Sequence, residues 1–185
     1  VILNALTPDF LGRFGSLFGL ILPCIVIASL SKNFLTQKNA INIIRQSSIT
    51  ALLALAVLLP ILTGGIDLSV GSIQGFTMCF LAYMAVTAKM NSFFAIALTR
   101  ILGLGRGYIN GLLLTKLRLP HPFISTLGML NVARGLALII TNGIPISGLP
   151  SGVRWLGADD IGGFPVCGIV VVVICLLYYG ILNHT

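Results

Sequence analysis

The chain has 185 residues, of which 57% are hydrophobic and only 8% are charged, and its mean hydropathy is +1.06. Because soluble domains carry about 25% charged residues, this composition excludes an ordinary soluble protein. The net charge of +7 does not indicate nucleic-acid binding, since the Lys and Arg residues lie mostly beside apolar runs and form no basic cluster with aromatic residues. Basic residues in such positions anchor helix ends at a membrane surface.

Long charge-free runs follow one another along the chain. They cover residues 14–31, 46–66, 68–88, 119–133, 135–153 and 161–182. As a helix with a rise of about 1.5 Å per residue, the second run would be about 31 Å long, which matches the roughly 30 Å hydrocarbon core of a bilayer. We therefore predict an all-α fold, a multi-spanning transmembrane bundle of about five to six spans that forms a single domain over residues 1–185.

Short connections separate these runs. Residues 31–45 form the first polar stretch, and residues 89–92 end the third run. The segment 93–115 is apolar but is interrupted by arginines. A Gly- and Pro-rich loop is predicted at 142–163, before the last span at 164–182.

Glycines recur at intervals of four residues in several of these segments. In a membrane, such small-residue faces let helix backbones approach closely. We therefore predict a helix-packing role for Gly71, Gly75, Gly103, Gly107 and Gly111. The text GLGRGYING at 103–111 is not a dinucleotide motif, because Tyr108 occupies the position of its third glycine.

No pattern of an enzyme or a metal site occurs in the sequence. The cysteines lie within apolar runs and form no C-x-x-C pair, and the histidines are isolated from them, which indicates inert thiols and no metal. These residues are Cys24, Cys79, Cys167, Cys175, His121 and His184. Asp159 and Asp160 have no histidine nearby in sequence, so we interpret them as a solvated loop and predict no catalytic residues and no cofactor.

The stretch ILTGGIDLSVGS, residues 61–72, places one carboxylate between two apolar runs. A charge at the centre of a span costs about 2.5–3.5 kcal/mol on insertion scales. Gly64 and Gly65 favour a helix break, after which Asp67 can cap the next helix by accepting from the backbone N–H of Ser69 or Val70. We therefore predict a broken helix at Gly64–Asp67. Asp67 can cap a helix and also contact substrate, because transporters place broken helices beside the substrate path.

The same stretch is similar to a signature of the permease subunits of bacterial ABC importers for ribose and related monosaccharides. Three further segments resemble this family: LSKNFLTQKNAINIIRQSSITALLALA, GYINGLLLTKLRLPHPFISTLGML and ARGLALIITNGIPI. The resemblance extends to ribose permeases and to allose, xylose and autoinducer-2 permeases. The final ILNHT resembles the family's sequence before a Gly-Arg pair, so the chain is expected to cover little more than an N-terminal half and to be incomplete at its C-terminus.

The resemblance implies a multi-pass subunit in the bacterial cytoplasmic (inner) membrane, surrounded by the lipid bilayer. Such a subunit translocates a ribose-type monosaccharide by alternating access and is not itself an enzyme. The implied partners are a separate ATP-binding cassette ATPase subunit, a periplasmic sugar-binding protein and a second permease subunit that completes a dimer.

Polar side chains in and after the break are the candidates for a substrate pathway: Asp67, Ser69, Ser72, Gln74, Thr126 and Asn131. Ser69 and Ser72 share one helical face, and uncharged donors and acceptors suit a neutral polyol better than an ion. For Thr126 and Asn131, a hydrogen bond across helices is an equal alternative. A different class of function, an ion-coupled carrier or a channel for a small polar solute, also stays open, with Asp67 as its single acidic residue within the spans.

The positions of the Lys and Arg residues also predict which ends of the spans face the cytoplasm. If every run crosses once, Lys116 and Arg118 lie opposite the basic stretch 31–45. If the break lies within the membrane, so that residues 46–88 make one net crossing, these basic residues share the inside, and Lys89 and Arg154 lie outside. The sequence favours this second arrangement, because it agrees with the cytoplasmic C-terminus that the resemblance implies.

Overall fold

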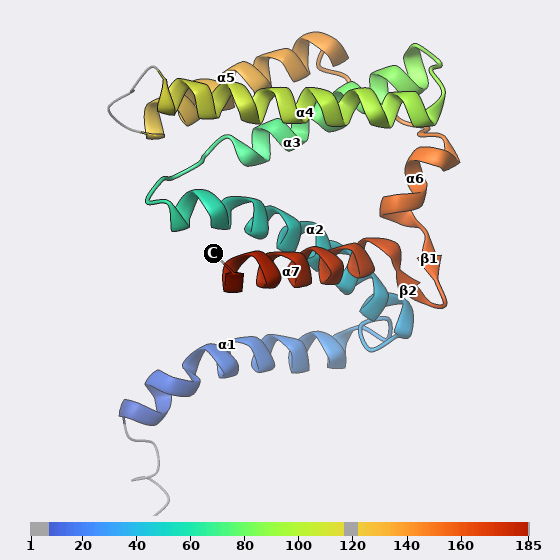
Figure 1. Ribbon diagram of the computed structural model, residues 1–185. Helices are drawn as coiled ribbons and strands as arrows, with labels where there is room; N and C mark the ends of the chain where they lie inside the picture. The colour runs from blue at the N-terminus through green and yellow to red at the C-terminus, as the bar shows by residue number, and fades with distance from the viewer. Residues whose placement is uncertain (1–7, 117–121, 185) are drawn as a thin grey trace, which may run out of the picture. The chain divides into compact units, whose positions relative to one another are not determined.

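The structure of the protein is a computed structural model that describes residues 8–116 and 122–184, without the side chains of residues 8–13, 114, 156 and 184. Its elements, in chain order, are α1 (Pro8–Leu30), α2 (Gln37–Leu62), α3 (Val70–Ala82), the π-helical turn η2 (Tyr83–Thr87), α4 (Ser92–Thr115), α5 (Pro122–Thr141), α6 (Ser151–Ala158), β1 (Asp160–Ile161), β2 (Phe164–Pro165) and α7 (Val166–His184) (Figure 1). Helices therefore dominate the fold, as predicted. The chain divides into two compact units, Val1–Ile44 and Arg45–Thr185, and its assignment to a single domain stays a prediction.

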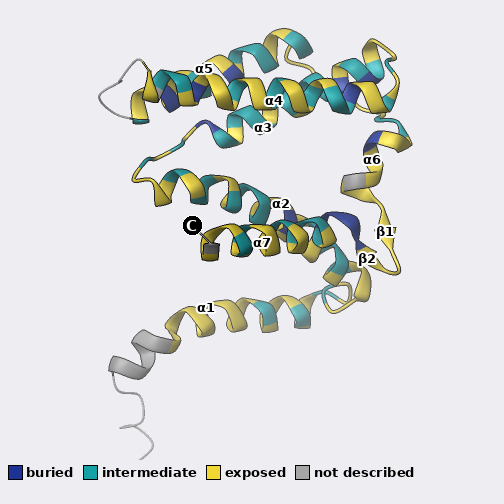
Figure 2. Cartoon of the chain, viewed as in Figure 1, coloured by how far each residue is buried: buried dark blue, intermediate teal, exposed yellow. Residues whose placement is uncertain are grey.

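Within the described ranges, four helices are long and apolar enough to cross a bilayer. They are Gln37–Leu62, Val70–Thr87, Pro122–Thr141 and Val166–Asn183, and Phe14–Leu30 is a shorter apolar helix. Few residues of these helices are buried (Figure 2), and many of their large apolar side chains are exposed. An apolar surface of this kind belongs in lipid or against other protein, which confirms the multi-spanning class predicted from composition.

The predicted break after α2 is present. The N–H of Gly65 donates to Pro60 O at 2.8 Å, and the N–H of Gly64 donates to Ile61 O at 3.0 Å. These two bonds form a Schellman motif. Gly64 occupies its left-handed position with φ +77°, a conformation that a residue without Cβ adopts at little cost. The glycine therefore ends α2 and frees the chain to start α3.

In the second unit, α3, α4 and α5 pack against one another (Figure 1). A small apolar core is formed by Ala85 of η2, Ala95 of α4 and Val153 of α6. The approach of α6 to α4 is close: a Cβ built on Gly152 would lie 2.9 Å from both Cβ and Oγ of Ser92. A glycine is therefore required for this helix contact.

The predicted loop at 142–163 contains more structure than its composition indicates. It includes α6, which begins after Pro150, and the first strand of a hairpin in which Asp160 pairs with Pro165 and Ile161 with Phe164. Gly162 and Gly163 form the hairpin turn with φ values of +59° and +84°. Positive φ at both central residues is the requirement of a tight two-residue turn, and two glycines satisfy it.

Contacts at the two ends of the second unit argue against the single net crossing of residues 46–88. At one end, Gly65 lies against Pro122. At the other end, Arg45 Nη2 lies 2.8 Å from Asp160 Oδ1, and η2 meets α6. Residues 45–62 and α3 with η2 each connect these two ends. Each run therefore traverses the unit once, and Arg45 lies on the side of α6 and its Arg154, not opposite to it.

Candidate functional site

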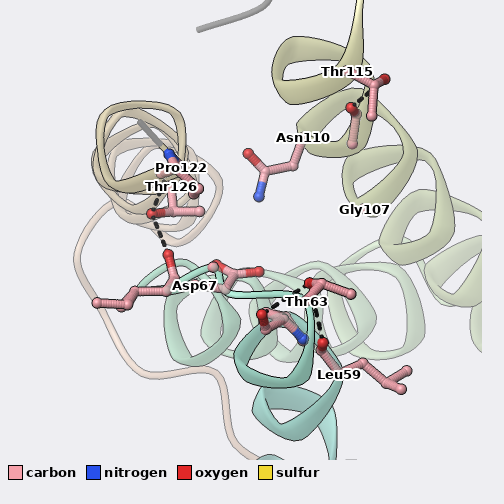
Figure 3. Close-up of a pocket in the computed structure, with 12 residues that line it drawn as sticks. Leu59, Thr63, Asp67, Gly107, Asn110, Thr115, Pro122 and Thr126 are labelled. Atoms are coloured by element: carbon pink, nitrogen blue, oxygen red, sulfur yellow. Dashed lines mark hydrogen bonds between the residues drawn. The ribbon is translucent and has the colours of Figure 1, made fainter. Parts of the chain in front are cut away.

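A cavity of about 560 Å³ lies at the break between α2 and α3, where this connection faces α4 and α5 (Figure 3). Small-molecule sites in proteins measure about 300–1,000 Å³, so the cavity has a suitable size. Its wall is mainly apolar. The polar side chains in it are those of Thr63, Asp67, Asn110, Thr115 and Thr126.

Asp67 organises the start of α3. Its Oδ1 accepts hydrogen bonds from the backbone N–H of Ser69 at 2.8 Å and from Ser69 Oγ at 2.6 Å. The predicted bond from the Ser69 N–H is therefore present, although the N-cap position belongs to Ser69 itself. Ser69 is fully buried, so Asp67 provides a partner for a polar group that has lost water. Within the part of the chain that the structure describes, no hydrogen bond engages Asp67 Oδ2.

The threonine hydroxyls of the cavity are engaged with backbone carbonyls. Thr63 Oγ1 lies 2.9 Å from Pro60 O, and Thr115 Oγ1 lies 2.9 Å from Gly111 O. Thr126 Oγ1 lies 3.0 Å from Pro122 O and 3.3 Å from Ile66 O. The last contact joins α5 to the non-helical connection between α2 and α3, and not to another helix as predicted.

Asn110 was not among the site residues predicted from the sequence. The side chain is only 7% exposed, and its Oδ1 has no hydrogen-bond partner among the described residues. Figure 3 shows this side chain extending from α4 toward the space between α5 and the break. The available signal was a lone amide between Gly107 and Gly111 in an apolar helix, but that signal alone does not reveal which way the side chain points.

The other predicted pathway residues do not all meet at this cavity. Ser72 lines a second cavity of about 530 Å³ between α3 and α5, together with Arg134. Gln74 is half-buried on α3. Asn131 is exposed, and its Nδ2 donates to Leu127 O of its own helix at 2.9 Å. The structure thus brings Asp67 and Thr126 together, and a pathway role for the whole set stays a prediction.

The predicted packing glycines differ in their surroundings. A Cβ at Gly103 would lie 3.7 Å from Thr77 Cγ2 of α3, in ordinary contact. Around the other four, no atom considered in the described structure lies within 4 Å of such a Cβ. These four line the cavities: Gly107 and Gly111 the first, Gly71 and Gly75 the second. Their packing role stays a prediction.

Cysteines and histidines contribute nothing to the cavity in the described part of the chain. All four cysteines are free thiols, and no group of three or more His, Cys, Asp or Glu side chains gathers among the described residues. Arg118 and His121 lie outside the described residues, as does the side chain of His184. Asp160 is not a purely solvated residue, because it pairs with Arg45.

Comparison with known proteins decides the family. The family model described as "Branched-chain amino acid transport system / permease component" matches residues 39–182. The chain belongs to this permease family. This assignment confirms the predicted recognition of a transport permease, and it agrees with the prediction that the chain is a non-catalytic, multi-pass membrane subunit.

Individual relatives of this permease are sugar and autoinducer importers. The ribose import permease protein RbsC of Bacillus subtilis (strain 168) is 38% identical over 175 residues, which are 94% of this chain and 54% of the relative. The RbsC of Escherichia coli (strain K12) is 34% identical over 174 residues, covering 92% and 54%. The autoinducer 2 import system permease protein LsrC of Salmonella typhi is 32% identical over 161 residues, covering 87% and 46%. The permease chain thus spans about half the length of the curated relatives it matches. No solved structure matches it.

Proposed function

We propose that the chain belongs to the membrane-spanning subunit of an ATP-driven importer that carries a ribose-type monosaccharide across the bacterial cytoplasmic membrane by alternating access. The observation that carries this proposal is the identity of 38% and 34% with two ribose import permeases over more than nine-tenths of the chain. The matched family is described as the permease component of a transport system, which supports the proposal that this subunit works with partner proteins. These partners are a separate ABC ATPase subunit, a periplasmic sugar-binding protein and a second permease subunit.

The chemistry of the cavity supports a neutral substrate over an ion. Asp67 is the one charged residue among the described residues that line this cavity, and its Oδ1 already accepts two hydrogen bonds from Ser69, whereas a Ca²⁺ site draws six to eight oxygen ligands, commonly with several carboxylates. The residues that line the cavity therefore give little support to the alternative of an ion-coupled carrier. A hydroxylated sugar, in contrast, uses the mixture of apolar surface and a few polar groups found here.

Uptake into proteoliposomes tests this proposal. The full-length permease would be reconstituted with its ATPase and binding protein, and radiolabelled ribose uptake measured with ATP or ADP inside, with and without a protonophore. We expect uptake that requires ATP and the binding protein and is unchanged by the protonophore. An ATPase subunit without its Walker A lysine is the control. Uptake that persists with ADP and collapses with the protonophore would instead establish a carrier.

Competition with unlabelled sugars tests the substrate class in the same vesicles. Because the relatives include both ribose and autoinducer 2 permeases, xylose, allose and autoinducer 2 are the informative competitors. We expect ribose to compete most strongly. Stronger competition by autoinducer 2 than by unlabelled ribose at equal concentration would transfer the assignment to that ligand.

A further inference from the structure

The polar groups of the cavity at the break differ in their free hydrogen-bonding capacity. Its threonines donate to backbone carbonyls, so their protons are used within the fold. Asn110 Oδ1 has no hydrogen-bond partner among the described residues, and the described hydrogen bonds of Asp67 use Oδ1 alone. The threonine Oγ1 atoms can still accept a hydrogen bond from a ligand, but among the described polar side chains of the cavity wall only the Asn110 amide keeps a proton to donate.

An unsatisfied buried amide is unusual in folded proteins and calls for an explanation. Asn110 is more than nine-tenths buried, so water compensates little for its missing partner. A hydrophobic residue of similar size would fold there without this penalty. The presence of an amide at such a position points to a partner that comes from outside the fold.

The surroundings of Asn110 leave open space beside its amide for such a partner. Gly107 lies one helical turn earlier on α4 and Gly111 follows Asn110 directly, and both line the cavity. A Cβ added at either glycine would meet none of the described atoms considered within 4 Å. The surface of α4 beside the amide is therefore bare, and across the cavity lie Asp67 and the break (Figure 3).

We propose that this cavity is a binding site for a neutral polyhydroxylated ligand and that the Asn110 amide recognises one of its hydroxyl groups. An amide both donates and accepts, and a carboxylate accepts, so adjacent hydroxyls of a sugar can satisfy Asn110 and Asp67 Oδ2 together. A purely apolar ligand would leave the amide unsatisfied. The inference deepens the proposed function, on which it rests, by assigning the substrate a site and a contact.

The decisive variant is Asn110→Leu, because it removes the amide while keeping the side chain's approximate size. If the amide serves a ligand, the thermal unfolding temperature of the purified full-length permease stays the same or rises, since an unsatisfied buried group has been removed. ATP-dependent ribose uptake then falls about tenfold or more. Asn183→Leu is the matched control: its amide is exposed on α7 and does not line the cavity, and we expect uptake within about twofold of the parent.

Deoxyribose analogues give a readout that a merely structural role would not change. In the parent, one analogue lacking a single hydroxyl should be transported about tenfold less well than ribose, because it leaves the amide unsatisfied. In Asn110→Leu, this discrimination should disappear. The inference is overturned if the variant transports ribose like the parent, if it discriminates among the analogues like the parent, or if its unfolding temperature falls together with uptake.

Failure of the proposed function gives a different result. If the parent importer shows no ATP-dependent ribose uptake, the proposed function is wrong. The site is then tested by the shift in unfolding temperature of the purified permease in ribose, xylose and glycerol. Stabilisation by these polyols in the parent that is absent in Asn110→Leu supports the site, and equal or no stabilisation in both overturns it.

Discussion

Asp67 acts on the fold through a single carboxylate oxygen. Oδ1 receives both the backbone N–H and the hydroxyl of Ser69, a local turn in which an Asp side chain replaces a backbone acceptor. The contact explains how the chain keeps a carboxylate between two apolar helices. The same residue also lines the cavity, so its structural role and a role toward substrate are compatible.

Asp67→Ala should destabilise the protein because it removes both acceptor contacts of the buried Ser69. We expect a loss of about 1–3 kcal/mol in the free energy of unfolding, measured by denaturant titration of the purified protein in detergent. Asp67→Asn keeps an acceptor oxygen and should lose less than half as much. Equal stability of Asp67→Ala and the parent would contradict the hydrogen bonds described here.

Contacts between residues close in sequence could be predicted, whereas contacts that depend on how the helices pack could not. The bond between Asp67 and Ser69 follows from a separation of two residues and standard capping chemistry. Asn110 was missed because its burial and its missing partner depend on how α4 lies against α5 and the break. Asn131 was selected for its chemistry, but its amide is bonded to its own helix.

At the scale of the elements, single glycines set the ends and approaches of helices. Gly64 ends α2 in a left-handed conformation, and Gly152 lets α6 approach α4. Both positions need the absence of a Cβ, one for backbone conformation and one for space. Substitutions to alanine separate these causes.

Gly64→Ala should destabilise the break by about 1 kcal/mol, because a Cβ is strained at φ +77°. Gly105→Ala is the matched control: Gly105 lies in the middle of α4, its Cβ would meet no described atom considered within 4 Å, and alanine is favoured over glycine in a helix interior by up to about 1 kcal/mol. The two substitutions should therefore change the free energy of unfolding in opposite directions. Equal effects would contradict the left-handed conformation of Gly64.

Gly152→Ala should destabilise the contact between α6 and α4 by about 1–3 kcal/mol, because its Cβ would overlap with Ser92. Ser92→Gly in the same chain should restore part of this loss, which a double-mutant cycle measures as a coupling energy. The control is Gly157→Ala in the same helix, where the added Cβ meets no described atom considered within 4 Å. An additive cycle would mean that the two residues do not touch.

At the scale of the whole molecule, composition predicted the apolar helices. It did not predict how many times residues 46–88 cross from one end of the second unit to the other. Length and hydropathy sufficed for the multi-spanning class. The single net crossing of residues 46–88 rested on the distribution of Lys and Arg, a statistical rule, and the pairing of Arg45 with Asp160 argues against it. The hairpin at 160–165 was missed because its strands are only two residues long, although adjacent glycines are a known turn signal.

Sided labelling tests this arrangement in intact vesicles of cysteine-free full-length permease. Gln46→Cys and Asp160→Cys should react with a membrane-impermeant maleimide from the same side, because Arg45 pairs with Asp160. Lys116→Cys, at the other end of α4, should react from the opposite side. Labelling of positions 46 and 160 from opposite sides would restore the single net crossing.

The central claim is that the substrate of this permease occupies the cavity at the break between α2 and α3. The most direct measurement is ATP-dependent ribose uptake by the full importer carrying Gly107→Leu, which fills the cavity, compared with Gly105→Leu on the same helix. Gly107 lines the cavity, and at both positions an added Cβ meets no described atom considered within 4 Å. We predict loss of uptake, about tenfold or more, for Gly107→Leu alone, with both variants assembled and equally stable. Parental uptake by Gly107→Leu would contradict the account.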